Sequence, residues 1–230
     1  MRFKLNSGDS YYCLGHREIL REKFLEHKCV DYEILELLLT YAIPRQDASP
    51  IAKNLLMTFG GVHKVITAPS KELVKLPGIG KSTAIFIKAI YEIMLLDYKN
   101  YLNNSPVFHD YQKLADYCKL LLSGKKVEEL HVLFLDSDYR LLSDDLHSSG
   151  TINWAAVYPR EILKRALNLN SCFAVMLHNH LGGAASFSSE DIRITLDVKK
   201  LLKNVDIELF DHLLVSGDMV YSARNMFLLN

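Results

Sequence analysis

The 230-residue sequence contains only four cysteines, and no two of them are closely spaced. They are Cys13, Cys29, Cys118 and Cys172. Without a Cys-x-x-Cys pair or a dense cysteine framework, the pattern excludes a disulfide-stabilised scaffold and argues against zinc held by thiolates. This cysteine usage is typical of a reducing compartment, and we therefore expect a cytoplasmic location.

Long apolar runs are also missing. The first ten residues, MRFKLNSGDS, lack the apolar core of a secretory signal. No segment approaches the roughly 18 consecutive apolar residues that a membrane span requires. We therefore expect no membrane association.

The sequence has no excess of charge of either sign. Its 27 basic and 27 acidic residues give a formal net charge of zero. Residues 1–100 carry 14 basic and 11 acidic side chains, and the rest of the chain carries 13 and 16. This balance excludes a strongly basic nucleic-acid-binding surface, so any contact with nucleic acid is expected to be local.

The first half of the chain has a helical pattern. Between residues 15 and 98 apolar residues recur at every third or fourth position, as in Ile34, Leu37 and Leu38. Proline and glycine interrupt the pattern repeatedly, which is typical of short helices. We predict a small helical bundle over residues 1–100, followed by a linker in the polar stretch 97–110.

The second half, over residues 108–230, is predicted to mix helices and strands. Apolar, β-prone runs at 127–135 and 171–177 indicate buried strands, and 207–223 indicates two strands joined at residues 216–218. Helices are predicted at 110–122, 159–169 and 188–204. Four aspartates are expected on a solvated hairpin, and Arg160 with Glu161 is expected to form an ion pair at a helix start. The aspartates are Asp136, Asp138, Asp144 and Asp145.

The segment HNHLGGAASFSSED, residues 178–191, is the strongest candidate for chemistry. His178 and His180 follow a predicted strand two residues apart, so their side chains point to the same side. With Asp191 they would form a three-ligand zinc site whose fourth position stays open. The alternative is a loop with unrelated histidines, in which Ser188 and Asp191 only form a helix capping box. Both interpretations can hold together.

The same segment resembles the HxH…SxxD motif of the JAMM/MPN metallo-isopeptidase domain, and more closely that of the bacterial RadC family. The stretches EELHVLFLDSDYRLL…GTIN…VYPREILKRAL, LFDHLLVSG, LELLLTYAIPRQD and LPGIGKSTA also resemble RadC, so the resemblance covers nearly the whole chain. It implies a helical N-terminal domain followed by an α/β MPN domain with a cytidine-deaminase-like fold.

Carried over by position, the resemblance implies one Zn²⁺ per chain, held by His178, His180 and Asp191. It makes Ser188 the donor to a tetrahedral oxyanion and Glu128 the general base and acid. Glu129 is the neighbour that could be mistaken for Glu128. Strand alternation sends the two side chains to opposite faces, so only one of them can face the metal.

Three positions in the loop depart from the usual RadC sequence, which has prolines and a serine at these positions. They are Leu181, Gly182 and Phe187. A Gly-Gly pair raises the entropy cost of ordering a loop, and proline would lower it. The sequence therefore predicts a looser loop and a less well-defined site. Downstream, Asp211-His212 is predicted either to orient a ligand histidine or to pack within a strand.

Residues 76–84, LPGIGKSTA, have the form of a helix-hairpin-helix turn. Gly78 and Gly80 would let backbone N–H groups approach a phosphate, while Lys81 and Ser82 open the following helix. Such contacts predict weak, salt-sensitive binding to the DNA backbone. The alternative is an ordinary helical hairpin that needs glycines for its turn.

Two functions therefore remain open. The first is a JAMM-type zinc hydrolase that cleaves an amide or isopeptide bond in a peptide or isopeptide substrate. The second is a DNA-associated accessory or repair protein with little or no catalysis, whose metal would be structural.

Overall fold

The computed structural model describes residues 7–44, 46–122, 124–150, 158–226 and 228–229 of the chain. These residues belong to two compact units, Met1–Ile93 and Met94–Asn230, and the boundary between the units lies within α6 (Lys81–Asn104). Within the described residues, no helix combines the length and the apolar character that crossing a membrane requires.

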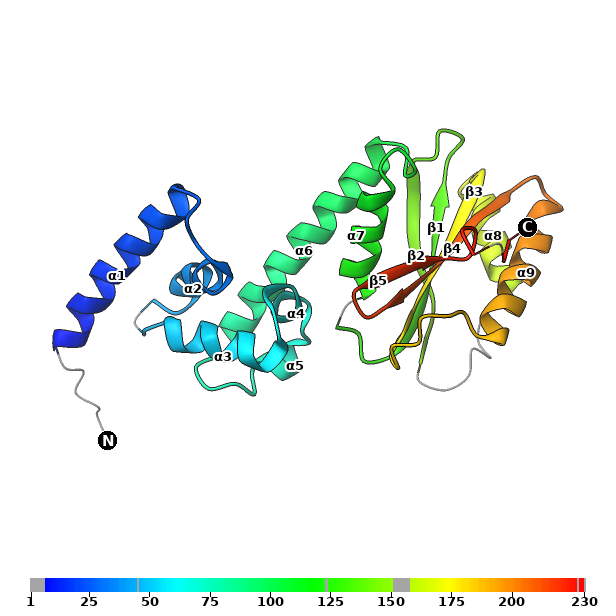
Figure 1. Cartoon of the computed structure of the whole chain (residues 1–230). Helices are drawn as coiled ribbons and strands as arrows, with labels where there is room; N and C mark the ends of the chain where they lie inside the picture. The colour runs from blue at the N-terminus through cyan, green and yellow to red at the C-terminus, as the bar shows by residue number, and fades with distance from the viewer. Residues whose placement is uncertain (1–6, 45, 123, 151–157, 227, 230) are drawn as a thin grey trace. The chain divides into compact units, whose positions relative to one another are not determined.

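The first unit is helical, as predicted (Figure 1). Its core is built from leucines, isoleucines and small residues at helical spacing, among them Leu35, Leu39 and Leu55. The chain turns sharply after α3 because Gly60 adopts a left-handed conformation with φ of 86°. Besides α6, the helices are α1 (Ser7–Leu25), α2 (Asp31–Ala42), α3 (Ser49–Phe59), α4 (Val62–Thr67) and α5 (Ser70–Leu73).

The predicted linker is partly wrong, because α6 continues to Asn104. Leu102 is fully buried, and the Asn104 side-chain amide donates a hydrogen bond to the Asn100 carbonyl at 2.7 Å. These contacts stabilise a helix that the polar composition did not indicate. The non-helical connection is confined to residues 105–110.

The second unit carries a mixed sheet, which confirms the predicted α/β architecture. In the part of the chain that the structure describes, the strand order is β2-β1-β3-β4-β5. Only β3 and β4 pair in parallel, and the other neighbours are antiparallel. The elements are α7 (Tyr111–Leu122), β1 (Glu128–Leu135), β2 (Leu141–Gly150), α8 (Pro159–Asn168), β3 (Phe173–His180), α9 (Ser189–Lys203), β4 (Glu208–Ser216) and β5 (Met219–Ser222).

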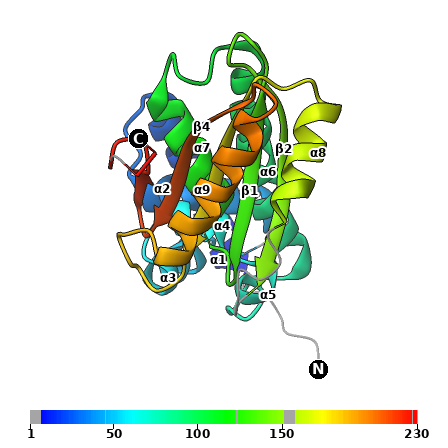
Figure 2. The same ribbon diagram turned by 90° about the vertical axis from the view of Figure 1, so that its right-hand side faces the viewer.

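The helices of this unit cover both faces of the sheet. Figures 1 and 2 show α8 and α9 on one face and α7 on the other. Alternate β1 residues Leu130, Val132 and Phe134 pack with Ile162 of α8 and Val198 of α9 in one apolar cluster. The remaining β1 residues point to the other face of the sheet, and β1 is buried along almost its whole length, as its continuous apolar run predicted.

The acidic hairpin differs from its prediction. Its second arm is the edge strand β2, and the Asp144 side chain is only 2% exposed rather than solvated. Asp144 accepts hydrogen bonds from the Tyr117 hydroxyl and from His131 Nδ1, the latter at 2.8 Å. Asp145 forms an ion pair with Arg165 of α8, in which Oδ2 lies 2.5 Å from Nε. The two neighbouring aspartates therefore anchor β2 to opposite faces of the sheet.

Several smaller predictions are confirmed. The helices predicted at 110–122, 159–169 and 188–204 correspond to α7, α8 and α9, and β4 and β5 meet at the predicted turn. Arg160 and Glu161 form an exposed ion pair with an N–O distance of 3.5 Å. The motif segment TINWAAV, at 151–157, lies outside the described residues.

Candidate metal centre

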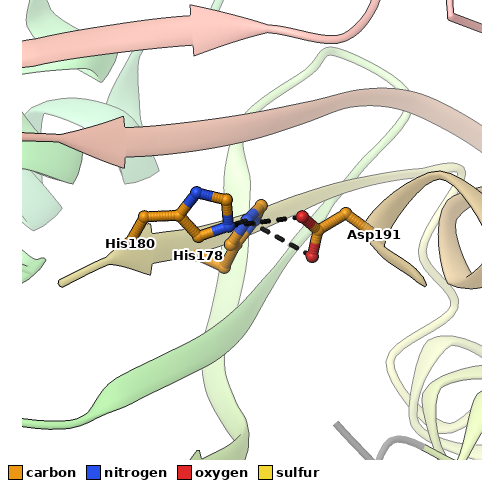
Figure 3. Close-up of side chains that lie close together, drawn as sticks. All are labelled: His178, His180 and Asp191. Carbon is orange, nitrogen blue, oxygen red and sulfur yellow. Dashed lines mark hydrogen bonds and ion pairs between the residues drawn. The ribbon is translucent and has the colours of Figure 1, made fainter. Parts of the chain in front are cut away.

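The structure brings His178, His180 and Asp191 together at one end of the sheet (Figure 3). One potential ligand atom from each residue lies within 4.8 Å of the others. His178 Nε2 is 3.1 Å from His180 Nε2 and 3.5 Å from Asp191 Oδ1. His180 Nε2 is 3.3 Å from Asp191 Oδ2. Figure 3 shows both imidazoles directed toward the carboxylate.

Strand alternation and a returning loop produce this arrangement. His178 lies near the end of β3, the central strand of the sheet, where it pairs with Leu130 of β1 and Leu214 of β4. His180 is two residues further along β3 and lies on the same face. The loop then turns back through Gly183, whose φ of 70° lies in the left-handed region that favours glycine. The loop ends at Ser188, the N-cap residue of α9.

Ser188 and Asp191 form the predicted capping box. The Asp191 N–H donates to Ser188 Oγ at 3.1 Å, while the Ser188 N–H and hydroxyl each donate to Asp191 Oδ2 at 2.7 Å. Asp191 is fully buried, and Oδ1 accepts no hydrogen bond from any described residue. Burial acts to raise the pKa of Asp191, but His178 and Ser188 outweigh it and hold that pKa well below its usual range.

These residues fit a zinc ion. A tetrahedral zinc ion with bonds of about 2.0–2.1 Å holds its ligand atoms about 3.3 Å apart. The two imidazole nitrogens, His178 Nε2 and His180 Nε2, lie 3.1 Å apart, and each lies close to one oxygen of the Asp191 carboxylate, at 3.5 Å from Oδ1 and 3.3 Å from Oδ2 respectively. A buried carboxylate oxygen without a hydrogen bond is costly unless a cation or another donor compensates it. Two imidazoles and one carboxylate are also a typical ligand set of catalytic zinc.

His178 is supported by a second, deeper histidine. Its Nδ1 lies 2.8 Å from His212 Nε2, and His212 Nδ1 lies 2.5 Å from Thr195 Oγ1. His178 and His212 are both fully buried. Burial lowers the pKa of each imidazole below its ordinary value, so both rings are neutral near pH 7. A neutral imidazole is the form that binds a metal.

The two residues of Asp211-His212 have different partners in the structure. His212 contacts the candidate ligand His178. Asp211 instead accepts hydrogen bonds from the Ser222 hydroxyl at 2.6 Å and the Arg224 N–H at 3.0 Å. Asp211 therefore stabilises the connection after β5, and its Oδ1 also accepts the backbone N–H of His212 at 2.7 Å.

Glu128 and Glu129 lie on opposite faces of β1. Glu128 Oε1 accepts the N–H of Leu181, the residue after His180, at 3.3 Å. Glu129 turns to the other face, where Oε2 lies 2.9 Å from Lys125 Nζ and 3.3 Å from His131 Nε2. Of these two glutamates, Glu128 is therefore the one whose carboxylate lies beside the candidate metal centre.

Sequence reasoning missed the role of Asn179, the residue between the two histidines. Its side-chain oxygen accepts the Glu129 N–H at 2.8 Å, and its side-chain nitrogen donates to the Val127 carbonyl at 3.2 Å. Asn179 thereby fixes the backbone on both sides of Glu128. The role could not be predicted from the sequence, because the backbone partners of Asn179 lie about fifty residues upstream.

Phe187, which replaces a proline of the usual RadC sequence, is buried in the candidate metal centre. Its ring centroid lies 5.7 Å from that of His178 and 5.1 Å from that of His212. The ring closes the apolar side of the histidine pair. Leu181 and Gly182 remain exposed at the other end of the loop.

The predicted nucleic-acid contacts form a separate feature in the first unit. Gly78, Gly80, Lys81 and Ser82 are all exposed at the start of α6. Gly78 has φ of 85°, and a Cβ there would lie 2.6 Å from the Ile51 side chain. The turn is therefore a specific backbone conformation that requires glycine.

Comparison with known proteins identifies relatives of the chain. A family model described as the RadC-like JAB domain matches residues 108–228. A UPF0758 protein from Ruegeria pomeroyi is 33% identical over 216 residues, which cover 93% of this chain and 96% of that protein.

Proposed function

This chain belongs to the RadC family, and from that premise we propose that it is a zinc-dependent hydrolase of amide or isopeptide bonds. One observation carries the proposal. His178, His180 and Asp191 converge, and the fully buried Asp191 keeps an oxygen without a hydrogen-bond donor among the described residues. Zinc bound there would act as a Lewis acid and lower the pKa of a coordinated water to about 7.

Glu128 is the residue proposed to move the proton. Its carboxylate is half-buried at the edge of the centre and is held by the N–H of Leu181. A carboxylate in that position can accept a proton from an attacking water and pass it to the leaving amine. Its neighbour Glu129 cannot do so, because it pairs with Lys125 on the other face of the sheet.

Ser188 is proposed to stabilise the oxyanion of the reacting carbonyl. Its hydroxyl proton is donated to Asp191 Oδ2, so it must change acceptor to serve an oxyanion. Asp191 Oδ2 would then still accept the Ser188 backbone N–H at 2.7 Å. The helix cap would therefore survive the exchange.

The metal is tested first, by elemental analysis of the purified chain after zinc reconstitution. We expect about one zinc ion per chain, as a three-ligand site implies. Asp191→Asn should lose it, whereas Asp197→Asn, an exposed aspartate on the same helix, should retain it. A wild-type chain without zinc after reconstitution would refute the metal centre.

Catalysis is tested on the zinc-loaded chain with a panel of peptides and isopeptides. We expect hydrolysis that Glu128→Gln reduces by about a hundredfold or more, in line with the usual contribution of a general base. Glu129→Gln is the matched control and should keep its activity. No hydrolysis by a fully loaded wild-type chain would refute the hydrolase.

A DNA-associated accessory role is the second candidate, and the turn at residues 76–84 is the observation that favours it. The exposed Gly78 and Gly80 precede α6, and Lys81 adds a positive charge at the start of that helix. Fluorescence anisotropy with branched and linear DNA should detect weak binding that falls with salt and with Lys81→Ala. No binding at low salt would exclude this role.

A further inference from the structure

A series of buried hydrogen bonds leads from one candidate ligand back to another. His178 Nδ1 is paired with His212 Nε2, and His212 Nδ1 is paired with Thr195 Oγ1. Thr195 Oγ1 donates to the backbone carbonyl of Asp191 at 2.5 Å. Each of these residues is at most 3% exposed. The series therefore joins His178 to the first turn of α9 out of reach of solvent.

The Asp191 carbonyl sets the direction of every proton in the series. A carbonyl can only accept, so the single hydroxyl proton of Thr195 points toward it. Thr195 Oγ1 must then accept from His212 Nδ1–H. A neutral His212 consequently has a bare Nε2, which accepts from His178 Nδ1–H. The remaining nitrogen of His178, Nε2, is left with a lone pair that faces His180 and Asp191.

The opposite direction is excluded by the same contacts. If Thr195 donated to His212, its oxygen and the Asp191 carbonyl oxygen would lie 2.5 Å apart without a proton between them. In that direction His178 would also carry its proton on Nε2, the nitrogen that faces Asp191, and this nitrogen could not bind a metal without losing the proton. Only the first set of tautomers places a proton between Thr195 Oγ1 and the Asp191 carbonyl oxygen.

We propose that Thr195 and His212 are positioning residues that fix His178 in the tautomer and orientation needed to bind a metal. The inference rests on the proposed zinc site and adds two residues that do not touch the ion. Because the series ends on the backbone of Asp191, it also ties the strand that carries one ligand to the helix that carries another. Partners of this kind typically change metal affinity by about 10–100-fold.

Thr195→Val is the most direct test, because valine keeps the shape of threonine and removes its hydroxyl. We expect zinc affinity, measured by competition with a chromophoric chelator, to fall by about 10–100-fold. Thr195→Ser restores a hydroxyl and should bind zinc within about threefold of wild type. The matched control is Thr67→Val, which removes a similar buried hydroxyl that donates to the carbonyl four residues earlier in the first unit.

A second readout reports the tautomers without metal. Nitrogen NMR of the imidazoles in the metal-free chain should show His178 and His212 protonated on Nδ1. Thr195→Val should disturb both signals, whereas Thr67→Val should leave them unchanged. Thermal unfolding checks that each variant is folded, and Thr195→Ala replaces Thr195→Val if valine is not accommodated.

The outcomes separate this inference from the proposed function. If wild type binds no zinc, the zinc hydrolase is refuted and this inference with it. If wild type binds zinc and folded Thr195→Val binds it equally well, only the positioning role is refuted. A folded Thr195→Ser that fails to restore affinity would likewise refute the hydroxyl as the cause.

Discussion

Replacing Asp144 with asparagine is expected to destabilise the sheet-bearing unit. The Asp144 carboxylate is buried between α7 and the sheet, where it accepts from His131 Nδ1 and the Tyr117 hydroxyl. Lys99 Nζ lies 3.3 Å from the same carboxylate. Asparagine keeps the shape of the side chain but removes its charge and presents an amide nitrogen to groups that themselves donate hydrogen bonds.

The size of the stability loss caused by Asp144→Asn follows from the burial of these partners. Removing one member of a buried, hydrogen-bonded ion pair costs about 3–5 kcal/mol. The Lys99 side chain is 39% exposed, so water compensates part of its loss. We therefore expect Asp144→Asn to lower the free energy of unfolding by about 3 kcal/mol at neutral pH, with most of the loss from His131 and Tyr117.

The effect should depend on pH in a defined direction. Burial acts to raise the pKa of Asp144, but His131, Tyr117 and Lys99 together lower it below its ordinary value. A carboxylate with a depressed folded-state pKa stabilises the fold above its unfolded pKa of about 3.9. That contribution is lost as the pH falls through the folded-state pKa. The difference between wild type and Asp144→Asn should therefore shrink below about pH 4.

Urea unfolding followed by circular dichroism at about pH 7 and about pH 3 measures this difference. The control is Asp138→Asn, because the Asp138 side chain is 65% exposed on the same hairpin and should contribute less than about 0.5 kcal/mol. A loss below about 1 kcal/mol for Asp144→Asn at neutral pH would refute the reasoning. A loss that stays constant down to about pH 3 would refute its electrostatic part.

Three further predictions concern the metal, the hairpin and the loop. Saturating zinc at about 1,000 times its Kd should raise the free energy of unfolding by about 4 kcal/mol, and calorimetry with a chelator should reverse this gain in wild type but find none in Asp191→Asn. Gly78→Ala should lower the free energy of unfolding by about 1–2 kcal/mol, because φ is positive at this position. Gly80→Ala should be tolerated, because its Cβ would meet no atom within 4 Å. Equal unfolding temperatures of the two variants would contradict this prediction. Phe187→Ala should cost about 3–5 kcal/mol in urea unfolding and weaken zinc binding, and an unchanged zinc affinity would show that its ring does not support the histidines.

The sequence predicted most of the fold because most elements are marked by local periodicity. Apolar residues at a spacing of three or four identified the helices, and β1 and β3 are continuous apolar runs. The edge strand β2 was missed because its sequence, LLSDDLHSSG, is mostly polar. Its burial comes from partners on other elements, such as Tyr117 and His131 for Asp144. Periodicity carries no information about such partners.

The sequence also predicted those parts of the candidate site that depend on residues close together in the chain. The side-chain alternation of a strand placed His178 and His180 on one face, and the spacing of a capping box placed Asp191 in the first turn of a helix. Thr195 was not identified, because its proposed role depends on a contact with His212, seventeen residues away in sequence. The loop also differs from a simple loss of proline, since Phe187 packs against two histidines.

The capping box and the proposed metal ligand would be two functions of one carboxylate, and the two oxygens of Asp191 have different hydrogen-bond partners. Asp191 Oδ2 accepts both hydrogen bonds from Ser188, which begin α9 at a defined residue. Oδ1 accepts none from the described residues and lies 3.5 Å from His178 Nε2. Because the cap holds the carboxylate before any ion arrives, little conformational entropy remains to be lost on binding. A helix start that explains the sequence motif without metal would therefore also preform the proposed site for a metal ion.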